Sequence, residues 1–355
     1  MKTIIFAGGA GTRLWPLSRK NSPKQFEKLF HGKSTIQLAY ERIAPILDNK
    51  DIYVSTNEKF VNILREQLPA LPEKNFFLEP AKRDLAAAVG LSFLKFKKMG
   101  YNGSIAILWA DHLMDRIEEF QKALKIADKL IKKDPNRFIF LGEKPRFANH
   151  NLGWITVGDK IGTENDISIL KFKSWKYRPE LKLCEQMFAS GESLWNPGYF
   201  ITSVDFVIKL YKKYMPKMYK SLEIIIANPE KIKDIYPVLE SISFDDAIVE
   251  KTKPEQAVVL QVDMGWSDPG TLYALKEALQ TSQDANVVKG KTYDLDSKDC
   301  LVFNYEDTKL VTTVGLSGMI VINMKDTMIV VHKDNVPKVK ELVAKLEASG
   351  LEKYI

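Results

Sequence analysis

The most informative part of the sequence is MKTIIFAGGAGTRLWPLSRKNSPKQF, the first 26 residues, from Met1 to Phe26. The apolar run at 4–7 predicts a short buried strand. A loop with Gly8, Gly9 and Gly11 follows it directly. Glycine lets backbone N–H groups come close to an anion, and successive N–H groups form a concave nest. The stretch therefore predicts a strand that ends in a phosphate-binding loop.

Two cations accompany this loop. Arg13 lies just beyond Gly11, and Lys24 comes later, directly after Pro23. Both can place fixed positive charge around a polyphosphate. The spacing is neither the Gly-x-x-x-x-Gly-Lys-Ser/Thr of P-loop enzymes nor the Gly-x-Gly-x-x-Gly of dinucleotide-binding folds, which disfavours both classes. The alternative interpretation is a tight strand-to-helix turn with surface cations.

Strand-like runs alternate with helical patterns over the first part of the chain. The strands are expected at 2–7, 51–56, 75–79, 104–109 and 138–141, and the helices at 35–47, 58–68, 85–98 and 117–133. Such alternation predicts an α/β fold, a Rossmann-like, mostly parallel sheet flanked by helices. Ligands of such sheets bind at the carboxyl ends of strands, where the glycine loop, Glu79 and Asp111 all fall.

The pattern changes near residue 286. Short β-like pieces at 300–303, 309–314, 319–322 and 328–331 precede a helical pattern at 336–346. We therefore expect a catalytic domain over 1–280 and a small β-rich domain with a terminal helix over 286–355. The β-rich part is a plausible interface of a homodimer.

Composition narrows the class of protein. The 355 residues are 45% hydrophobic and 27% charged, which is ordinary for a globular protein. No apolar run approaches 18 residues and no signal peptide precedes the first strand, so we expect neither a membrane span nor export. Two cysteines, Cys184 and Cys300, indicate a reducing compartment, and we expect a cytoplasmic protein. The net charge of +7 comes from scattered lysines, which disfavours a nucleic-acid partner.

The N-terminal stretch resembles a known signature. Gly-Gly-x-Gly-x-Arg-Leu-x-Pro-Leu followed by Pro-Lys is similar to that of the sugar-nucleotide pyrophosphorylases, and the longer form with Trp15, Ser18-Arg19 and Gln25-Phe26 resembles the mannose-1-phosphate guanylyltransferase branch. The resemblance implies a nucleotidyltransferase (GT-A-like) fold with a left-handed β-helix-like C-terminal domain. It implies transfer of GMP from GTP to a sugar 1-phosphate, with mannose 1-phosphate expected. The nucleotide-binding residues that it implies are Ala7, Gly8, Gly9, Gly11, Thr12, Arg13, Lys24, Glu79, Arg83 and Asp111.

Glu79 and Arg83 belong to a Glu-Pro-x-x-Arg stretch that faces the base in the resembling family. A carboxylate accepts two hydrogen bonds, and the Watson–Crick edge of guanine offers the N1–H and N2–H donors. The alternative for Glu79 is a surface residue before a helix N-terminus. The family continues Arg-Asn-Thr-Ala, whereas this chain has Arg83-Asp84-Leu85-Ala86.

Two aspartates match the metal-binding positions of the resembling family. Asp111 precedes His112, as in Gly/Pro-x-Asp-His, and Asp268 ends the Gly-Trp-x-Asp of the segment at 263–270. Both would hold Mg²⁺, which prefers oxygen ligands, so the expected catalytic set is Arg13, Lys24, Asp111 and Asp268. The alternatives are a helix N-cap for Asp111 and a plain Asp-Pro-Gly turn for Asp268.

The sugar-phosphate site departs from the family pattern. Asn196 in the turn-like Trp-Asn-Pro-Gly, and Asp245 and Glu250 in Phe-Asp-Asp-Ala-Ile-Val-Glu-Lys, resemble its sugar-binding segments, with a turn and an exposed helix face as alternatives. Gly153 survives from an eroded Gly-Tyr-Gly-Tyr-Ile segment, and Lys176 or Lys173 replaces the lysine of Phe-x-Glu-Lys-Pro. These departures leave open a different hexose or heptose 1-phosphate, or a regulatory homologue that binds a nucleotide sugar without turnover.

Overall fold

The computed structural model describes residues 1–9, 11–30, 32–282 and 284–355. The chain forms two compact units. Unit 1 comprises residues 1–8, 39–110 and 114–266, and unit 2 comprises residues 9–38, 111–113 and 267–355. The segment 9–38, which contains the rest of the glycine loop and both cations and is called the signature loop below, thus belongs to the same unit as the C-terminal part of the chain. The domain boundary expected between residues 280 and 286 stays a prediction.

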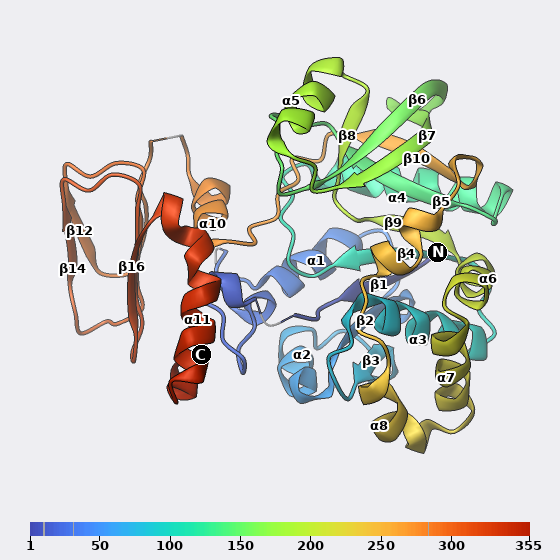
Figure 1. The fold of residues 1–355 in the computed structure, drawn as a ribbon, viewed down its shortest axis with the longest axis horizontal. Coiled ribbons are helices and arrows are strands. Elements are labelled where there is room, and N and C mark those ends of the chain that lie inside the picture. The colour runs from blue at the N-terminus through green and yellow to red at the C-terminus, as the bar shows by residue number, and fades with distance from the viewer. Residues whose placement is uncertain (10, 31, 283) are drawn as a thin grey trace. The chain divides into compact units, whose positions relative to one another are not determined.

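Unit 1 is built on one mixed sheet (Figure 1). Its strands are β1 (Lys2–Phe6), β2 (Ile52–Asn57), β3 (Phe76–Glu79), β4 (Ser104–Trp109), β5 (Phe138–Glu143), β6 (Gly153–Glu164), β7 (Ile167–Tyr177), β8 (Ser193–Asn196), β9 (Phe200–Ser203) and β10 (Ala257–Val262). They lie in the order β10-β7-β6-β8-β5-β9-β4-β1-β2-β3. β4, β1, β2 and β3 are parallel to one another, so their carboxyl ends share one edge.

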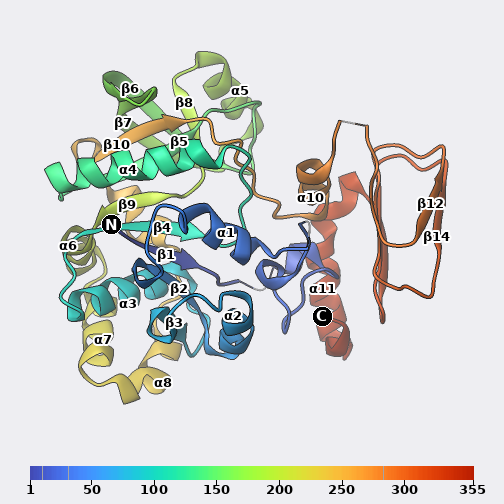
Figure 2. The ribbon, with the colours of Figure 1, turned by 180° about the vertical axis from the view of Figure 1, so that it is seen from behind.

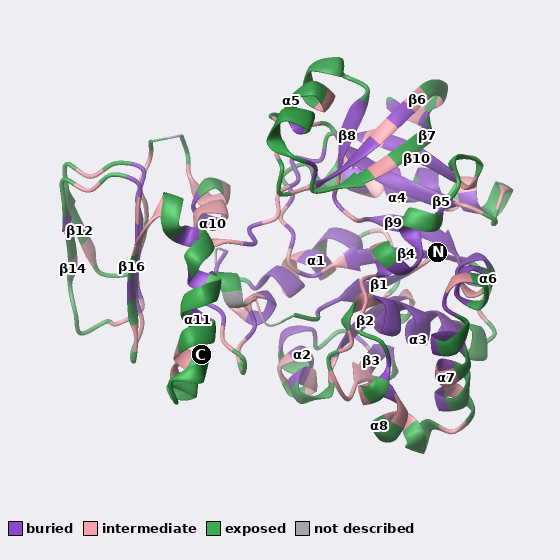
Figure 3. Cartoon of the chain, in the orientation of Figure 1, coloured by how far each residue is buried: buried purple, intermediate pink, exposed green. Residues whose placement is uncertain are grey.

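Helices surround this sheet, some packed on its faces and some on other helices (Figures 1 and 2). They are α1 (Thr35–Ile43), α2 (Val61–Gln67), α3 (Asp84–Lys98), α4 (Ile117–Lys133), α5 (Leu181–Ser190), α6 (Val204–Tyr214), α7 (Pro216–Ala227), α8 (Ile232–Ile235) and α9 (Phe244–Ala247). The core of unit 1 joins α3, α6 and α7 to alternate residues of the strands, and α3 is buried along most of its length (Figure 3). A Cβ at Gly90 of α3 would lie 2.7 Å from Leu222 Cδ1, so the missing side chain allows this close packing.

Most of the predicted elements are confirmed. β4 and α4 have the predicted bounds, and α3 begins one residue early, at Asp84. The helix expected at 35–47 ends at Ile43, because Pro45 disfavours helical backbone in the residue before it. Along the described part of the chain, no helix is long and apolar enough to cross a membrane.

The C-terminal part of unit 2 is a coil of short strands. They are β11 (Val287–Lys289), β12 (Thr292–Leu295), β13 (Leu301–Asn304), β14 (Val311–Val314), β15 (Met319–Asn323) and β16 (Met328–His332), after α10 (Leu272–Leu279) and before α11 (Val339–Ala348). β11, β13 and β15 stack in parallel, as do β12 and β14, and β16 closes the larger sheet antiparallel to β15. Inside the coil Asn323 donates to the side-chain oxygen of Asn304 at 2.8 Å.

The core of unit 2 includes the signature loop. Leu14, Trp15 and Leu17 are buried in one cluster with residues of α10, the coil and α11. The indole N–H of Trp15 donates to the backbone oxygen of Tyr354 at 2.7 Å. The apolar positions of the N-terminal signature are therefore held mainly by residues between Leu272 and Ile355.

Candidate active site

Glycine gives the signature loop its shape. Gly9 and Gly11 have φ values of +99° and +59°, in the left-handed region that other residues rarely adopt. At Gly11 a Cβ would also lie 2.5 Å from Ser18 Oγ and 3.1 Å from Lys24 Cγ. The absence of a side chain at Gly11 thus lets the side chain of Lys24 pack directly against the backbone of the loop. Space is open around Gly8 and Gly9, where an anion could approach the backbone.

The ends of the loop are fixed in different ways. Ala7 follows β1, and its N–H donates to Ser55 O at 2.8 Å while its oxygen accepts from the Thr56 hydroxyl. Thr12 begins the short 3-10 helix that carries Arg13. The N–H of Lys24 donates to Ser18 Oγ at 2.9 Å. Both cations therefore stand on backbone that local hydrogen bonds hold in place.

Lys24 lies between two carboxylates. Its Nζ is 2.7 Å from Asp111 Oδ2 and 3.8 Å from Asp268 Oδ1. The Lys24 side chain is only 12% exposed, whereas about a third of each aspartate reaches solvent (33% and 31%). Arg13 lies beside this group, with its Nη2 3.3 Å from the position of a Cβ on Gly270. The structure thus brings all four expected catalytic residues together within unit 2.

The charges in this cluster stabilise one another. Burial alone would lower the pKa of Lys24, but the carboxylates of Asp111 and Asp268 raise it above its usual value. Burial likewise opposes ionisation of Asp111, and the charges of Lys24 and His112 nevertheless hold its pKa well below the usual range. Lys24 is therefore a cation and Asp111 an anion at neutral pH.

Backbone pairing positions the two aspartates. Leu113 and Ser267 form an antiparallel bridge, with N–H to oxygen distances of 3.0 Å and 3.1 Å. Since α4 begins at Ile117, Asp111 is not its N-cap, and that alternative is excluded. The turn expected at Asp268 is present, because the N–H of Gly270 donates to Asp268 O at 2.7 Å. The turn places the Asp268 side chain beside Lys24, so a turn at this position is compatible with a metal-binding role for Asp268.

Glu143 holds the backbone that precedes Asp268, a role that the sequence analysis did not predict. It ends β5, its side chain is 0% exposed, and it accepts from the N–H groups of Met264 and Trp266 at 2.8 Å and 3.1 Å. The buried run 138–143 has the pattern of an ordinary strand, which does not indicate this role. An acidic residue at the end of such a strand was the one available signal.

The cluster has the donors for a hard cation. Among the residues that the structure describes, no group of three or more His, Cys, Asp or Glu could hold a metal by itself. However, Asp111 and Asp268 both lie within 4 Å of one positive charge, that of Lys24. Carboxylate oxygens suit Mg²⁺, which usually takes one or two of them and completes its shell with phosphate and water. The residues present therefore fit such an ion bound together with a nucleotide.

Glu79 is a half-buried acceptor at the end of β3. Its carboxylate accepts from the hydroxyls of Tyr236 and Ser55 at 2.6 Å and 2.9 Å. Burial raises its pKa, although these two hydrogen bonds oppose the shift. Each carboxylate oxygen has a second acceptor site, so Glu79 can still bind a pair of donors. The alternative of a plain surface residue does not account for these contacts.

Arg83 lies just before α3 and has an unused donor. Its Nε is buried and has no hydrogen-bond partner. The next residue, Asp84, adopts a φ of +59°, which is uncommon for any residue but glycine. A buried donor without a partner costs free energy, so a bound acceptor would stabilise this side chain.

The expected sugar-phosphate residues of the sheet fall into two groups. Gly153 pairs with Asn196 across β6 and β8, so they share one face, and a Cβ on Gly153 would lie 3.4 Å from Asn196 Cβ. Lys176 of β7 pairs with Trp154, so its exposed side chain lies on the other face. The residue beside Gly153 is instead Trp175, whose Nε1 would be 3.3 Å from that Cβ. Trp175 was not among the residues predicted for the sugar-phosphate site.

Asn196 also closes a turn. Its Oδ1 accepts from the N–H of Gly198 at 2.9 Å, which is the turn that served as the alternative to sugar binding. This hydrogen bond fixes the side chain and leaves its amide group as a donor.

Asp245 and Glu250 lie in neighbouring short helices. Asp245 belongs to α9 and is half-buried, whereas Glu250 is exposed. Burial raises the pKa of Asp245 to about 7, and the charges of Asp246, Glu250 and Asp84 add to the shift. The two residues expected to bind the sugar therefore lie close enough to interact, and the raised pKa means that Asp245 is protonated more readily than an exposed aspartate.

Asp245→Asn should change how stability depends on pH. The unfolded chain loses the proton near the usual pKa of 3.8 and the folded protein near 7, so the free energy of unfolding of the wild type falls as pH rises through this window. Asparagine cannot ionise, so the variant should gain stability relative to the wild type between pH 4 and 7 and keep that gain above it. Urea unfolding at pH 5 and pH 8 measures the difference. Parallel pH profiles for the two proteins would contradict the prediction, and Asp234→Asn, at an exposed position of α8, is the matched control.

Two known protein families match most of the chain. A family model described as nucleotidyl transferase matches residues 2–285, and one described as MannoseP isomerase/GMP-like beta-helix domain matches residues 290–346. The chain belongs to the nucleotidyl transferase family. The predicted family, the α/β fold and the β-rich C-terminal domain are thereby confirmed.

Curated relatives place the chain within one branch of the nucleotidyl transferases. It is 32% identical to a mannose-1-phosphate guanylyltransferase of Salmonella montevideo, over 99% of this chain and 75% of that protein. A mannose-1-phosphate guanylyltransferase of Escherichia coli is 29% identical, over 99% of this chain and 76% of the relative. A solved structure of a mannose-1-phosphate geranyltransferase from Thermus thermophilus has a TM-score of 0.86 at 28% identity and covers 98% of this chain and 99% of its own.

Proposed function

We propose that this nucleotidyl transferase transfers GMP from GTP to mannose 1-phosphate and releases pyrophosphate. The observation that carries the proposal is Lys24, held between Asp111 and Asp268 beside Arg13. A binding protein for a phosphate would need the cations, but it would have no use for two carboxylates facing one of them. The names of the relatives support the choice of nucleotide and sugar.

The reaction needs position and counter-charge more than a strong base. An oxygen of the sugar phosphate, already an anion, forms a bond to the α-phosphorus of GTP, and the bond from that phosphorus to the pyrophosphate oxygen breaks. Negative charge gathers on the α-phosphate oxygens and on the departing pyrophosphate. Arg13 and Lys24 would neutralise this charge, while the backbone of Gly8, Gly9 and Gly11 would cradle the phosphates. Few titratable bases are required, which fits a cluster of lysine, arginine and aspartate.

Asp111 and Asp268 would hold the divalent ion, which we propose to be Mg²⁺. When bound, such an ion neutralises phosphate oxygens and fixes the geometry of the displacement. The two carboxylates would supply hard oxygen ligands to this ion, and the Lys24 ammonium, which they pair with here, would then be free to contact phosphate. Metal and nucleotide should consequently bind together.

Glu79 would read the guanine base, with Arg83 near the same end of the substrate. Glu79→Gln should lower kcat/KM for GTP by about 10- to 100-fold, because a charged acceptor for two donors is replaced by a neutral amide with one acceptor. Residual activity with ATP should not fall, since adenine does not present the same two donors. Initial rates of pyrophosphate release with each nucleotide measure this ratio.

Tyr236→Phe is the companion variant to Glu79→Gln. It removes the hydroxyl that donates to Glu79 at 2.6 Å and leaves the carboxylate charge in place. A smaller fall for GTP than with Glu79→Gln supports direct reading by the carboxylate. Equal loss for GTP and ATP in Glu79→Gln would contradict that role.

A different sugar 1-phosphate is the second candidate for the acceptor. The observation that favours it is the place of Lys176, which lies on the opposite face of the sheet from Gly153 and Asn196, with Trp175 beside Gly153. An aromatic face next to an amide is suited to a sugar ring. Asn196, Asp245 and Glu250 would then decide which hydroxyl pattern is accepted.

We further propose that the protein works in the cytoplasm as a homodimer through its C-terminal strands. Several large apolar side chains of this coil are more than half exposed: Val288, Tyr293, Leu295, Leu310, Val314, Met328 and Val330. A second copy of the coil offers the same apolar surface, as a two-fold interface requires.

Product analysis tests the proposed function. The purified protein is incubated with GTP, mannose 1-phosphate and Mg²⁺, and the products are identified by chromatography with mass spectrometry. GDP-mannose and pyrophosphate in equal amounts are expected. A protein that binds GTP or GDP-mannose and forms neither product would be the regulatory homologue instead.

A further inference from the structure

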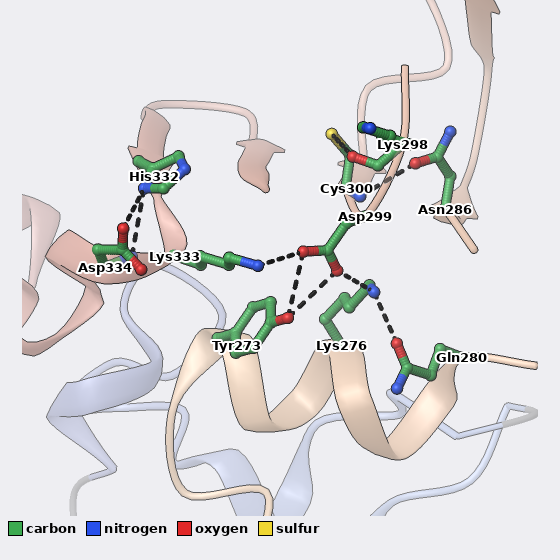
Figure 4. Close-up of polar contacts among 10 residues, drawn as sticks. All are labelled: Tyr273, Lys276, Gln280, Asn286, Lys298, Asp299, Cys300, His332, Lys333 and Asp334. Atoms are coloured by element: carbon green, nitrogen blue, oxygen red, sulfur yellow. Dashed lines mark hydrogen bonds and ion pairs between the residues drawn. The ribbon is translucent and has the colours of Figure 1, made fainter. Parts of the chain in front are cut away.

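A buried ionic cluster joins α10 to the C-terminal strands (Figure 4). The carboxylate of Asp299, only 8% exposed, forms ion pairs with Lys276, which is 0% exposed, and with Lys333 at 2.7 Å. The hydroxyl of Tyr273 donates to the same carboxylate at 3.2 Å. Tyr273 and Lys276 stand on α10, Asp299 precedes β13, and Lys333 follows β16. One carboxylate therefore ties three separate segments of unit 2 together.

The cluster is costly to build and sensitive to the loss of any member. Burial alone would raise the pKa of Asp299, but the hydrogen bonds from Lys276 and Lys333 hold it below the usual value. Asp299 adopts a φ of +56°, so its backbone is also held in an uncommon conformation. Buried ion pairs often stabilise a fold no better than apolar packing would, and fixing one arrangement is their best-attested use.

α10 connects directly to the proposed metal site. It begins after Thr271, whose hydroxyl accepts from the N–H of Ala274 at 3.2 Å. Asp268 precedes that cap by one turn of backbone, which is closed by the N–H of Gly270 on Asp268 O. Only Pro269, Gly270 and Thr271 separate Asp268 from the first turn of α10, and Tyr273 belongs to that turn.

We infer that Asp299 is a positioning residue that orients Asp268 through α10. This inference rests on the proposed function. The C-terminal coil is then part of the apparatus for nucleotidyl transfer, because it holds the segment that delivers one of the two aspartates beside Lys24. Asp299 itself does not contact the reacting groups.

Binding of Mn²⁺ in the presence of GTP tests this inference without turnover. Without a sugar phosphate no product forms, and the electron paramagnetic resonance signal of free Mn²⁺, corrected by a titration of Mn²⁺ into GTP alone, gives both the dissociation constant and the number of sites. Asp299→Asn should raise the dissociation constant about 10-fold, as loss of a partner behind a metal ligand commonly does. The number of sites per folded chain should not change, and kcat for pyrophosphate release should fall by a similar factor.

Milder variants cover the case in which Asp299→Asn does not fold. Lys333 is 37% exposed, so Lys333→Met should fold and raise the dissociation constant in the same direction, and Lys333→Arg, which keeps the cation, should restore it. Lys345→Met breaks the exposed Glu341–Lys345 pair of α11 and is the matched control. A lower melting temperature or fewer sites with an unchanged dissociation constant would overturn the inference. A wild-type protein that binds Mn²⁺ with GTP but makes no product with any sugar phosphate would overturn the proposed function instead.

Discussion

Lys24→Met should lower kcat for pyrophosphate release by about 10²- to 10³-fold, the usual cost of removing one charge-stabilising donor from a transition state. The variant should still fold, because methionine keeps the length of the apolar stem beside Gly11. Initial rates at saturating GTP and sugar phosphate measure the loss. Lys20→Met is the control within the same loop, since Lys20 pairs with Glu347 at the surface, and it should leave kcat unchanged.

The same variant should bind divalent metal more readily before the nucleotide arrives. In the wild type the Lys24 ammonium is 2.7 Å from Asp111 and 3.8 Å from Asp268, where it competes with any other cation. Without it the two carboxylates repel each other, and a divalent ion relieves that repulsion. The melting temperature of Lys24→Met should therefore rise more on addition of Mg²⁺ than that of the wild type. Equal rises, together with unchanged turnover, would contradict the role given to Lys24.

Asp111→Asn should be the second severe loss, about 10²-fold or more in kcat/KM at a fixed, low Mg²⁺ concentration. Asparagine keeps the shape of the side chain but removes the negative charge that pairs with Lys24 and would bind a divalent ion. Raising the Mg²⁺ concentration should recover part of the activity, because a weakened ligand set is filled at higher metal. Rates measured across a Mg²⁺ titration give both quantities.

A double variant separates shared from independent roles in this pair. Lys24→Met with Asp111→Asn should cost less than the product of the two single losses, since residues that act as a unit are not additive. Fully multiplicative losses would mean that the two residues serve different steps. An Asp111→Asn enzyme with wild-type rates at low Mg²⁺ would remove Asp111 from the metal site.

The sequence predicted the parts of the site that a short stretch of chain determines. β1, the glycine loop and the two cations lie within 26 residues, and glycine spacing reports backbone geometry directly. The strand ends at Glu79 and near Asp111 followed from the alternation of strands and helices. Their common edge is confirmed by the parallel order of β4, β1, β2 and β3.

Contacts between distant segments could not be predicted in the same way. Trp15 reaches Tyr354, and Glu143 accepts from Met264 and Trp266, with no periodic pattern that links these positions. The face on which Lys176 lies depended on the register of β6 against β7, and a shift of one residue would have reversed it. Strand pairing between distant parts of a chain is what one sequence specifies least visibly.

Initial rates of pyrophosphate release, measured with GTP and Mg²⁺ and the 1-phosphates of mannose, glucose, fucose and heptose, test the proposed reaction and its acceptor together. Release with mannose 1-phosphate should be well above that with the other sugars. Preference for another sugar would keep the reaction and change the acceptor. No release with any of them, from a folded protein that still binds GTP, would contradict the account.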